Sequence, residues 1–209
     1  MTGETRDDRL KAVYEATDAT ALERSYDDWA KDYDADLRTF GYMSPTIAVA
    51  LAARHVPTDR GAVLDAGAGT GIVGELLALI GYRELTALDL SSGMLEVARR
   101  KGVYSDLHQA ALGSSLDLPD DAFAGVVCVG TFTGGHVGPD ALPELIRVTR
   151  PGGALVYSLT EPVYDAFERE HGRLEREGAW TRLEVSGEFD PLPNDADAPM
   201  SRVYAFRVA

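Results

Sequence analysis

The chain has 209 residues, of which 45% are hydrophobic and 26% are charged, and its formal net charge is −14 at pH 7. This length supports one sizeable hydrophobic core, and the apolar and charged fractions are those of a globular protein, so disordered and fibrous classes are excluded. A surface this negative repels phosphate groups. We therefore expect no nucleic-acid partner and no anionic membrane partner.

The single cysteine, Cys128, excludes an internal disulfide, and it lies in an apolar run where we expect it to be buried packing and not a nucleophile. The first residues are acidic and lack the apolar segment of a signal peptide, and no apolar stretch reaches the roughly 20 residues of a membrane span. We therefore expect a cytoplasmic protein. No group of Cys and His has the spacing of metal ligands, so we expect no metal.

The first 60 residues show helical patterns. Ser25 is interpreted as an N-cap with Asp28 at the third helical position. The apolar face would then carry Tyr26, Trp29, Ala30, Tyr33 and Leu37. A second helix is predicted to begin at Ser44-Pro45. Its inward residues would be Ile47, Ala50 and Leu51. We predict that residues 1–60 form a helical lid.

Residues 61–159 alternate short apolar runs with helical patterns. The predicted strands are 61–66, 85–89, 107–112, 123–130 and 154–159. The predicted helices are 72–80, 91–102 and 139–149. Such alternation is typical of an α/β fold, in which crossover helices on both faces join parallel strands. Ligands of such sheets bind beyond the carboxyl ends of the strands.

The C-terminal residues follow a different pattern. Residues 181–189 and 202–208 alternate like strands, and we expect them to add an antiparallel pair to the edge of the sheet. The residues between them, 190–199, are rich in Pro, Asp and Asn and are predicted to form a flexible acidic loop. We expect residues 61–209 to form the core of a protein that is a single domain overall.

A glycine-rich loop, LDAGAGTG at residues 64–71, follows the first predicted strand. Glycine permits positive φ and a close approach of a ligand to the backbone. A plain tight turn between strand and helix is the alternative, but three alternating glycines exceed what such a turn needs. Residues 69–74 also fit the dinucleotide pattern G-x-G-x-x-G, and the lack of a following G-K-[ST] excludes a P-loop.

Asp65 discriminates between the ligands that such a loop binds. A carboxylate immediately before the loop would oppose the pyrophosphate of a dinucleotide, whereas it would attract a cation. S-adenosylmethionine (SAM) carries a sulfonium and an ammonium group and no phosphate. SAM is therefore favoured, and a nicotinamide-dependent oxidoreductase is a distant alternative that rests only on Gly69 to Gly74.

Asp89 ends the second predicted strand. Its carboxylate is suited to accept hydrogen bonds from both ribose hydroxyls, a group that NAD and SAM share. The alternative is an acidic residue that only stabilises a helix N-terminus, because Ser91 beside it is a possible N-cap.

Several segments taken together resemble the class I SAM-dependent methyltransferases: LDAGAGTG, LTALDLSSGML, LPDDAFAGVV and the PGG turn before a strand. Longer segments are similar to the methyltransferase-like family named after the Williams–Beuren syndrome chromosome region: YDDWAKDYDADLRTFGY, GIVGELL, LDLSSGMLEVARRKGVY and GTFTGGHVGPDALPELIRVTRPGG. The resemblance covers roughly residues 25–160. It implies a Rossmann-like, doubly wound sheet of seven strands with the last strand antiparallel, and SAM as the cofactor.

The resemblance also implies which residues would bind the cofactor. The methionine portion of SAM would be held by Asp65, Gly67, Gly69 and Gly71 and faced by Gly130 and Thr131. The ribose would be held by Asp89, and the adenine would pack against Leu90 and Met94.

The chain departs from the family pattern at the adenine. Class I enzymes often place an acidic residue after the third strand, where it meets the adenine amino group. This chain has Ala110-Ala111-Leu112 there. Backbone groups of Ala111 and Leu112 would serve instead, or Asp106 or Asp117 would lie nearer than the spacing suggests.

Methyl transfer is an in-line displacement at the methyl carbon, so the enzyme chiefly positions a nucleophile about 3 Å from that carbon. A hydroxyl or carbon nucleophile needs a base, and His136 in the loop after the fourth strand is the catalytic candidate, with a purely structural role as the alternative. Tyr33 is the second catalytic candidate, because it would cover the methyl group with Tyr26 through cation–π attraction. The alternative is an ordinary core stripe. Arg38 would pair with the SAM carboxylate.

The function that these patterns favour is methyl transfer from SAM to a small-molecule acceptor, through an O, N, S or C nucleophile. Two alternatives keep the SAM site: a lyase or cyclase that consumes SAM without a methyl acceptor, and a SAM-binding protein without catalytic activity. The sequence leaves the acceptor and the oligomeric state open.

Overall fold

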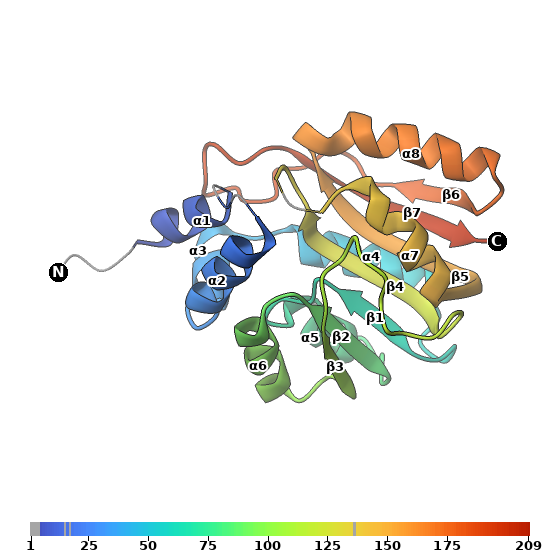
Figure 1. The fold of residues 1–209 in the computed structure, drawn as a ribbon, viewed down its shortest axis with the longest axis horizontal. Helices are drawn as coiled ribbons and strands as arrows, with labels where there is room; N and C mark the ends of the chain where they lie inside the picture. Colours follow the sequence, from blue (N-terminus) through green and yellow to red (C-terminus); the bar gives the residue numbers. More distant parts are fainter. Residues whose placement is uncertain (1–4, 15, 17, 136) are drawn as a thin grey trace.

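The computed structural model describes residues 5–14, 16, 18–135 and 137–209. Seven strands form one sheet in the order β3-β2-β1-β4-β5-β7-β6 (Figure 1). They are β1 (Val63–Ala66), β2 (Leu85–Asp89), β3 (Asp106–Gln109), β4 (Phe123–Phe132), β5 (Thr149–Thr160), β6 (Trp180–Val185) and β7 (Ser201–Val208). β7 is antiparallel to both of its neighbours, and the other pairs are parallel. The predicted α/β class and the seven-stranded sheet with its last strand antiparallel are confirmed.

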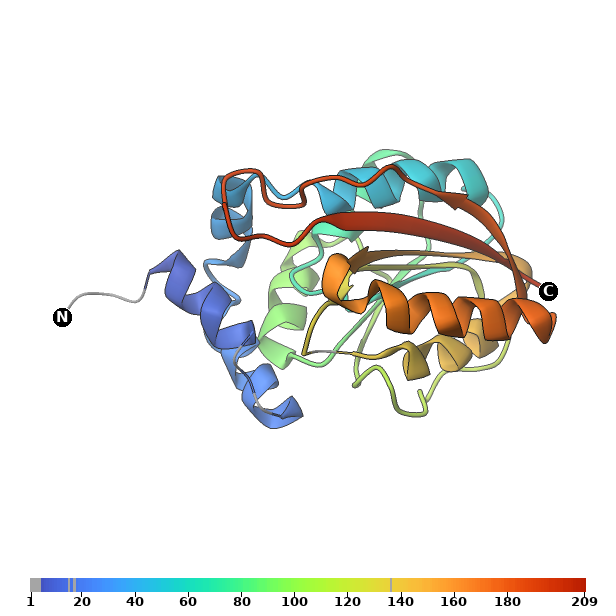
Figure 2. The ribbon, with the colours of Figure 1, turned by 90° about the horizontal axis from the view of Figure 1, so that it is seen from above.

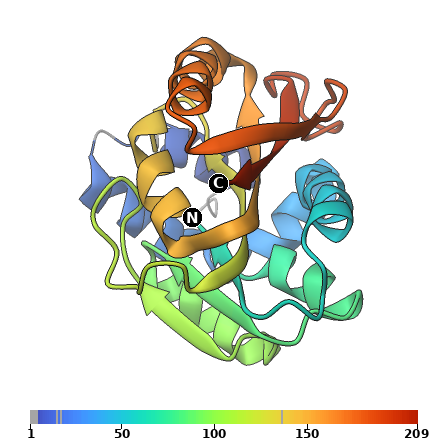
Figure 3. The same cartoon turned by 90° about the vertical axis from the view of Figure 1, so that its right-hand side faces the viewer.

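Helices cover both faces of this sheet (Figure 3). The helices in the described part of the chain are α1 (Arg6–Tyr14), α2 (Ala19–Trp29), α3 (Tyr33–Phe40), α4 (Ser44–His55), α5 (Ile72–Leu79), α6 (Ser92–Lys101), α7 (Leu142–Val148) and α8 (Tyr164–Arg176), with 3-10 turns at Pro139–Ala141 and Glu161–Val163. Side chains alternate along β4, so Val127 packs with α4 and α5, whereas Val126 and Cys128 pack with α7 and α8. The sheet therefore has a hydrophobic core on each face.

The strand register brings three strand ends together. Asp65 of β1 pairs with Ala87 of β2 and with Val127 of β4. The carboxyl ends of β1, β2 and β4 therefore lie side by side. The helices α1, α2 and α3 lie beyond this edge of the sheet, at the end of the molecule far from the C-terminus (Figure 2).

The start of α2 differs from the prediction. Asp18 is its N-cap, because its carboxylate accepts a hydrogen bond from the backbone N–H of Ala21 at 2.9 Å. Ser25 lies inside the helix, where its hydroxyl donates to the carbonyl of Ala21 at 3.0 Å. The predicted N-cap at Ser25 is therefore wrong, because a serine hydroxyl that bonds back to its own preceding turn is compatible with a helix interior.

α4 belongs to the helical layer on the sheet, although it lies within residues 1–60. Ala48, Leu51 and Ala52 are buried in the core between α4, α5 and the sheet. Ala50, which was expected to point inward, is exposed. The apolar composition of α4 gives little contrast between its faces, so the sequence alone did not identify the buried one.

Acidic side chains join the N-terminal helices to the core. Asp27 of α2 accepts hydrogen bonds from the Ser91 hydroxyl at 2.5 Å and from the Gly93 N–H at 2.8 Å, both at the N-terminus of α6. Asp34 of α3 pairs with Lys101 at the C-terminus of α6, with 2.7 Å between Oδ2 and Nζ. These contacts hold α2 and α3 over the carboxyl end of the sheet.

The loop at residues 190–199 is also tied to the N-terminal helices. The Pro191 carbonyl accepts from the Met43 N–H at 2.9 Å. Asn194 donates through its backbone to the Phe40 carbonyl at 3.1 Å and through its side chain to the Thr39 carbonyl at 2.9 Å. The loop that composition predicted to be flexible therefore has defined partners beside α3.

α8 buries a histidine among aromatic rings. His171 is fully buried, and its Nε2 lies 2.6 Å from the hydroxyl of Tyr157. Trp180 and Phe206 stack beside it with 3.9 Å between their ring centroids. Burial lowers the pKa of His171 from 6.5 to about 4, against the opposing attraction of Glu168. The folded protein therefore holds this imidazole neutral.

We predict that His171 makes the protein acid-sensitive. Its pKa is lower in the folded than in the unfolded chain, so the unfolded chain binds the extra proton between about pH 6.5 and 4. The stabilisation is present above pH 6.5 and is lost as the pH falls through this window, by about 3 kcal/mol in all. Urea unfolding at pH 7, 6, 5 and 4 should show a shallower decline for His171→Gln than for the wild type. His108→Gln, which removes a half-buried imidazole of β3 that pairs with Asp106, is the control, and equal slopes in all three proteins would contradict the assignment.

Candidate functional site

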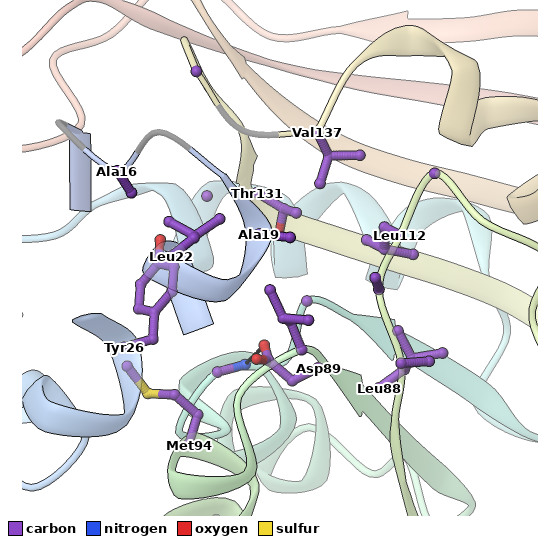
Figure 4. A pocket seen from close by; sticks show the side chains of 18 of the residues that line it. Ala16, Ala19, Leu22, Tyr26, Leu88, Asp89, Met94, Leu112, Thr131 and Val137 are labelled. Atoms are coloured by element: carbon purple, nitrogen blue, oxygen red, sulfur yellow. Dashed lines mark hydrogen bonds between the residues drawn. The ribbon is translucent and has the colours of Figure 1, made fainter. Parts of the chain in front are cut away.

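A cavity of about 490 Å³ lies at the carboxyl ends of β1, β2 and β4, under α2 (Figure 4). In Figure 4, Tyr26 and Met94 lie on one side of it, Leu112 and Val137 on the other, and Asp89 between them. The predicted cofactor residues that line it are Tyr26, Tyr33, Gly67, Gly69, Asp89, Leu90, Met94, Ala111, Leu112, Gly130 and Thr131. The fold thus brings together side chains from five separate segments of the chain.

Three of the predicted cofactor residues do not line the cavity. Arg38 is exposed on α3, because the apolar face of that helix turns Leu37 inward. Asp65 is fully buried, and neither Asp65 nor Gly71 borders the cavity. His136, the predicted base, lies outside the described residues.

The glycines of the loop are required for different physical reasons. A Cβ on Gly67 would lie 2.1 Å from Oγ1 of Thr131, so this glycine lets the loop pack against β4. Gly69 has a φ of +54° and its Cβ position meets nothing within 4 Å, so it borders open space in the cavity. The N–H of Gly69 donates to Oδ2 of Asp89 at 2.7 Å. The loop is therefore clamped to the end of β2.

Tyr104 is a site residue that the sequence reading missed. A Cβ on Gly74 would lie 2.1 Å from its hydroxyl oxygen, and a Cβ on Gly71 would lie 2.9 Å from its ring. The hydroxyl donates to Oδ2 of Asp65 at 2.6 Å. Gly71 and Gly74, two positions of the dinucleotide-like pattern, therefore make room for the Tyr104 ring. Tyr104 follows the helix C-cap Gly102 with no periodic pattern, so nothing in the sequence marked it.

The carboxylates of Asp65 and Asp89 lie close enough to repel each other when both are ionised. Burial raises the pKa of Asp65 to about 7, with the charge of Asp89 acting in the same direction and the Tyr104 hydrogen bond opposing it. Burial also raises the pKa of Asp89, although its bonds from Ser91 and Gly69 oppose the shift. Oδ1 of Asp65 is buried without a hydrogen-bond partner among the described residues. A cation placed near these groups would restore the ionised form of both.

Asp89 bonds to the N-terminus of α6 and also borders the cavity. Its Oδ1 accepts from the N–H of Ser91 at 2.9 Å, and the Ser91 hydroxyl in turn caps α6 by accepting from the N–H of Met94 at 3.0 Å. Its Oδ2 holds Gly69 and borders the cavity. A carboxylate has about four acceptor sites, so two bonds leave capacity for the hydroxyls of a bound ligand.

Aromatic rings from α2 and α3 form the roof of the cavity. Tyr26 and Tyr33 meet edge to face at 6.4 Å between centroids, and both border the cavity. Trp29 lies behind them, buried, with its ring 4.8 Å from Tyr33 and its Nε1 donating to Asp36 at 2.8 Å. Trp29 therefore packs against Tyr33 and orients its ring.

The segment after β3 brings no acidic side chain of its own to the cavity. Ala110, Ala111 and Leu112 border the cavity, whereas Asp106 and Asp117 are exposed and lie outside it. The polar groups available to a ligand at this end are the backbone N–H and carbonyl groups of that segment and the carboxylate of Asp140, which borders the cavity close to Gly113.

Other reactive side chains lie away from the cavity. Cys128 is buried, and burial raises the pKa of its thiol well above the usual range, so it is no nucleophile. His55 pairs with Glu184 on the surface of α4. Within the part of the chain that the structure describes, no group of three or more His, Cys, Asp or Glu could hold a metal ion, and no helix is long and apolar enough to span a bilayer.

A doubly wound sheet with an antiparallel last strand, a glycine loop after β1 and an acidic residue ending β2 define a class I SAM-dependent methyltransferase. The profile described as a methyltransferase domain matches residues 63–153. Methyltransferase-like protein 27 of Homo sapiens is 35% identical over 183 residues, which cover 84% of this chain and 74% of that protein. The chain belongs to this methyltransferase-like family and uses SAM as its cofactor.

Two further comparisons extend this result. The demethylmenaquinone methyltransferase of Renibacterium salmoninarum is 34% identical over 146 residues, which cover 68% of this chain and 60% of that enzyme. The crystal structure of the [4+2]-cyclase SpnF superposes with a TM-score of 0.72 at 15% identity and covers 92% of this chain and 97% of that chain. The second likeness shows a shared fold.

The residues present fit the charge of SAM, which supplies the transferable methyl group on a sulfonium that is a good leaving group. Asp65, which is buried, and Asp89, which borders the cavity, both have a raised pKa, and Oδ1 of Asp65 has no partner among the described residues. The same arrangement opposes a pyrophosphate, which would bring two more negative charges to Asp65 and Asp89.

We predict that Tyr104 sets the pH range of cofactor binding. Its hydrogen bond lowers the pKa of Asp65, so Tyr104→Phe should raise that pKa above about 7 while keeping the ring in place. Asp65 is then neutral up to a higher pH. In the wild type, SAM affinity should rise from pH 6 to 8, and in the variant the same rise should occur at higher pH. Calorimetric titration at several pH values measures this. Tyr82→Phe, a buried tyrosine of the α4 and α5 side, is the control, and a loss of affinity that is equal at all pH values would contradict the prediction.

Proposed function

We propose that this protein transfers the methyl group of SAM to a small-molecule acceptor in the cavity under α2. The observation that carries the proposal is a pair of carboxylates at the ends of neighbouring strands: Asp65 is buried, and Asp89 borders a cavity of about 490 Å³. A cavity of this size is in the usual range for a small-molecule site. The formal net charge of −14 supports a partner other than nucleic acid.

The proposed cofactor contacts follow the lining of the cavity. Gly67 and Gly69 hold the methionine portion, with Asp65 acting on its ammonium group from beneath the loop. Asp89 accepts hydrogen bonds from the ribose. The adenine packs on Leu90, Met94, Ala111 and Leu112, and Gly130 and Thr131 face the methionine end. Gly71 contributes indirectly, because it gives Tyr104 its place against Asp65.

The proposed catalytic contribution is positioning. Tyr33 and Tyr26 cover the methyl group from the roof, where aromatic faces attract a sulfonium by about 0.5–2 kcal/mol and exclude water. We assign the lid function to α1, α2 and α3, which enclose the carboxyl end of the sheet. The role of His136 as a base for a hydroxyl or carbon nucleophile stays a hypothesis, as does a cytoplasmic location.

Two relatives bear names that fit a small acceptor. The demethylmenaquinone methyltransferase of Renibacterium salmoninarum is named for a quinone precursor. The malonyl-[acyl-carrier protein] O-methyltransferase of Serratia marcescens, 41% identical over 100 residues that cover 46% of this chain and 37% of that enzyme, is named for a carrier-bound acid. Both names support an acceptor of low molecular weight at the reacting end.

The ribose contact provides the direct test. Asp89→Asn removes the negative charge but keeps the shape of the side chain, and it should weaken binding of S-adenosylhomocysteine by more than tenfold, or about 1.4 kcal/mol. Isothermal titration calorimetry measures this, with Asp106→Asn as the control because Asp106 is an exposed acid outside the cavity. Unchanged affinity would show that Asp89 is misassigned, and binding of NAD without binding of S-adenosylhomocysteine would refute the proposed function.

A further inference from the structure

A second, smaller cavity adjoins the first. Its volume is about 70 Å³, and it shares Tyr26, Tyr33 and Gly130 with the larger one. It lies between the N-terminal helices, the ends of β4 and β5, and the loop at 190–199. We call it the hydroxyl chamber, because five serine and threonine side chains line it beside its tyrosines: Ser44, Thr133, Ser158, Thr160 and Ser201. The shared tyrosines are those proposed to cover the methyl group, so the chamber lies beside the proposed place of methyl transfer.

The hydroxyl chamber concentrates buried polarity. All five of its serine and threonine residues are buried, and they make up nearly half of the buried polar and charged side chains described in this protein. Of the described residues that line it, none carries a charge. The remaining lining is aromatic, aliphatic, proline or glycine, with Trp29 and Leu192 among them. The chamber therefore offers hydrogen bonds but no counter-charge.

One of these hydroxyls has no hydrogen-bond partner within the described part of the chain. Ser158 accepts from the N–H of Gly130 at 2.9 Å, and Ser201 donates to the carbonyl of Leu159 at 2.8 Å. Oγ1 of Thr160, by contrast, is buried without a hydrogen-bond partner among the described residues, and it does not cap the 3-10 turn that follows it. An unpartnered buried hydroxyl is unfavourable, so a ligand that bonds to Thr160 recovers that free energy.

The size and charge of the chamber restrict what enters it. A volume of 70 Å³ is less than half of the about 150 Å³ cavity that accommodates benzene, so it takes a group of only a few heavy atoms. An ionised group would lose its hydration without gaining a counter-charge. A neutral hydroxyl or carbonyl keeps its hydrogen bonds through the serine and threonine side chains.

We propose that the hydroxyl chamber is the acceptor subsite and that it binds the uncharged, oxygen-bearing end of the acceptor, with Thr160 as a specificity-determining residue. This inference rests on the proposed function and adds the acceptor class, a neutral molecule that presents a hydroxyl or carbonyl oxygen. The rest of the acceptor lies in the larger cavity beside Tyr26 and Tyr33.

Three probes of one shape test the charge preference. Acetamide, acetate and acetamidinium have four heavy atoms each and are neutral, anionic and cationic. Each is titrated into the protein saturated with S-adenosylhomocysteine, and the shifts of backbone amide NMR signals are followed. We expect acetamide to shift the signals of Gly130, Thr160 and Ser201 and to bind at least tenfold more tightly than either ion. Equal binding of an ion, or shifts that map away from the chamber, would overturn the proposal.

A pair of matched variants tests the role of Thr160. Thr160→Val keeps the shape and removes the unpartnered hydroxyl, so acetamide affinity should fall several-fold while the fold is retained. Thr86→Val is the control, because Thr86 is equally buried but lies in β2 outside both cavities. Unchanged acetamide affinity in Thr160→Val would refute the role of Thr160. Calorimetry with S-adenosylhomocysteine on the same samples separates the proposed function from the acceptor subsite. Absence of cofactor binding in the wild type would refute the proposed function. Intact cofactor binding without selectivity for acetamide would refute only the acceptor subsite.

Discussion

The rest of the site depends on the repulsion between two neighbouring carboxylates, that of buried Asp65 and that of Asp89 at the border of the cavity. Parallel strands end at one edge of a sheet, so acidic residues at the ends of β1 and β2 are forced together. Burial and mutual repulsion raise the pKa of Asp65 to about 7. Such a pair is more favourable beside a cation than without one, and the same charges oppose a diphosphate.

Much of the surrounding structure holds that pair in place. Tyr104 donates to Asp65, and the N–H groups of Gly69 and Ser91 donate to Asp89. Gly74 is required because any side chain there would displace the Tyr104 ring. Residues 69–74 fit a dinucleotide-binding pattern, but two glycines of that pattern, Gly71 and Gly74, accommodate the Tyr104 ring.

The enclosure of the cavity depends on segments that are distant in the chain. Asp27 and Asp34 anchor α2 and α3 to the two ends of α6. The loop at 190–199 bonds to α3 and the residues after it, and so closes the side of the hydroxyl chamber. Part of the high acidic content therefore serves to position the roof, in addition to setting the surface charge.

The sequence by itself determined the α/β class, the bounds of β2, the cap of α6 at Ser91 and eleven of the residues that line the cavity. These features follow from local patterns: apolar runs, glycine spacing and capping residues. Only the tertiary structure decided that Asp65 and Gly71 do not border the cavity and that Arg38 faces solvent. It also decided that Tyr104 bonds to Asp65 and that the Thr160 hydroxyl has no partner among the described residues. Such roles arise from contacts between residues far apart in the chain, and no local pattern encodes which distant side chain fills the space beside a glycine or leaves a hydroxyl without a partner.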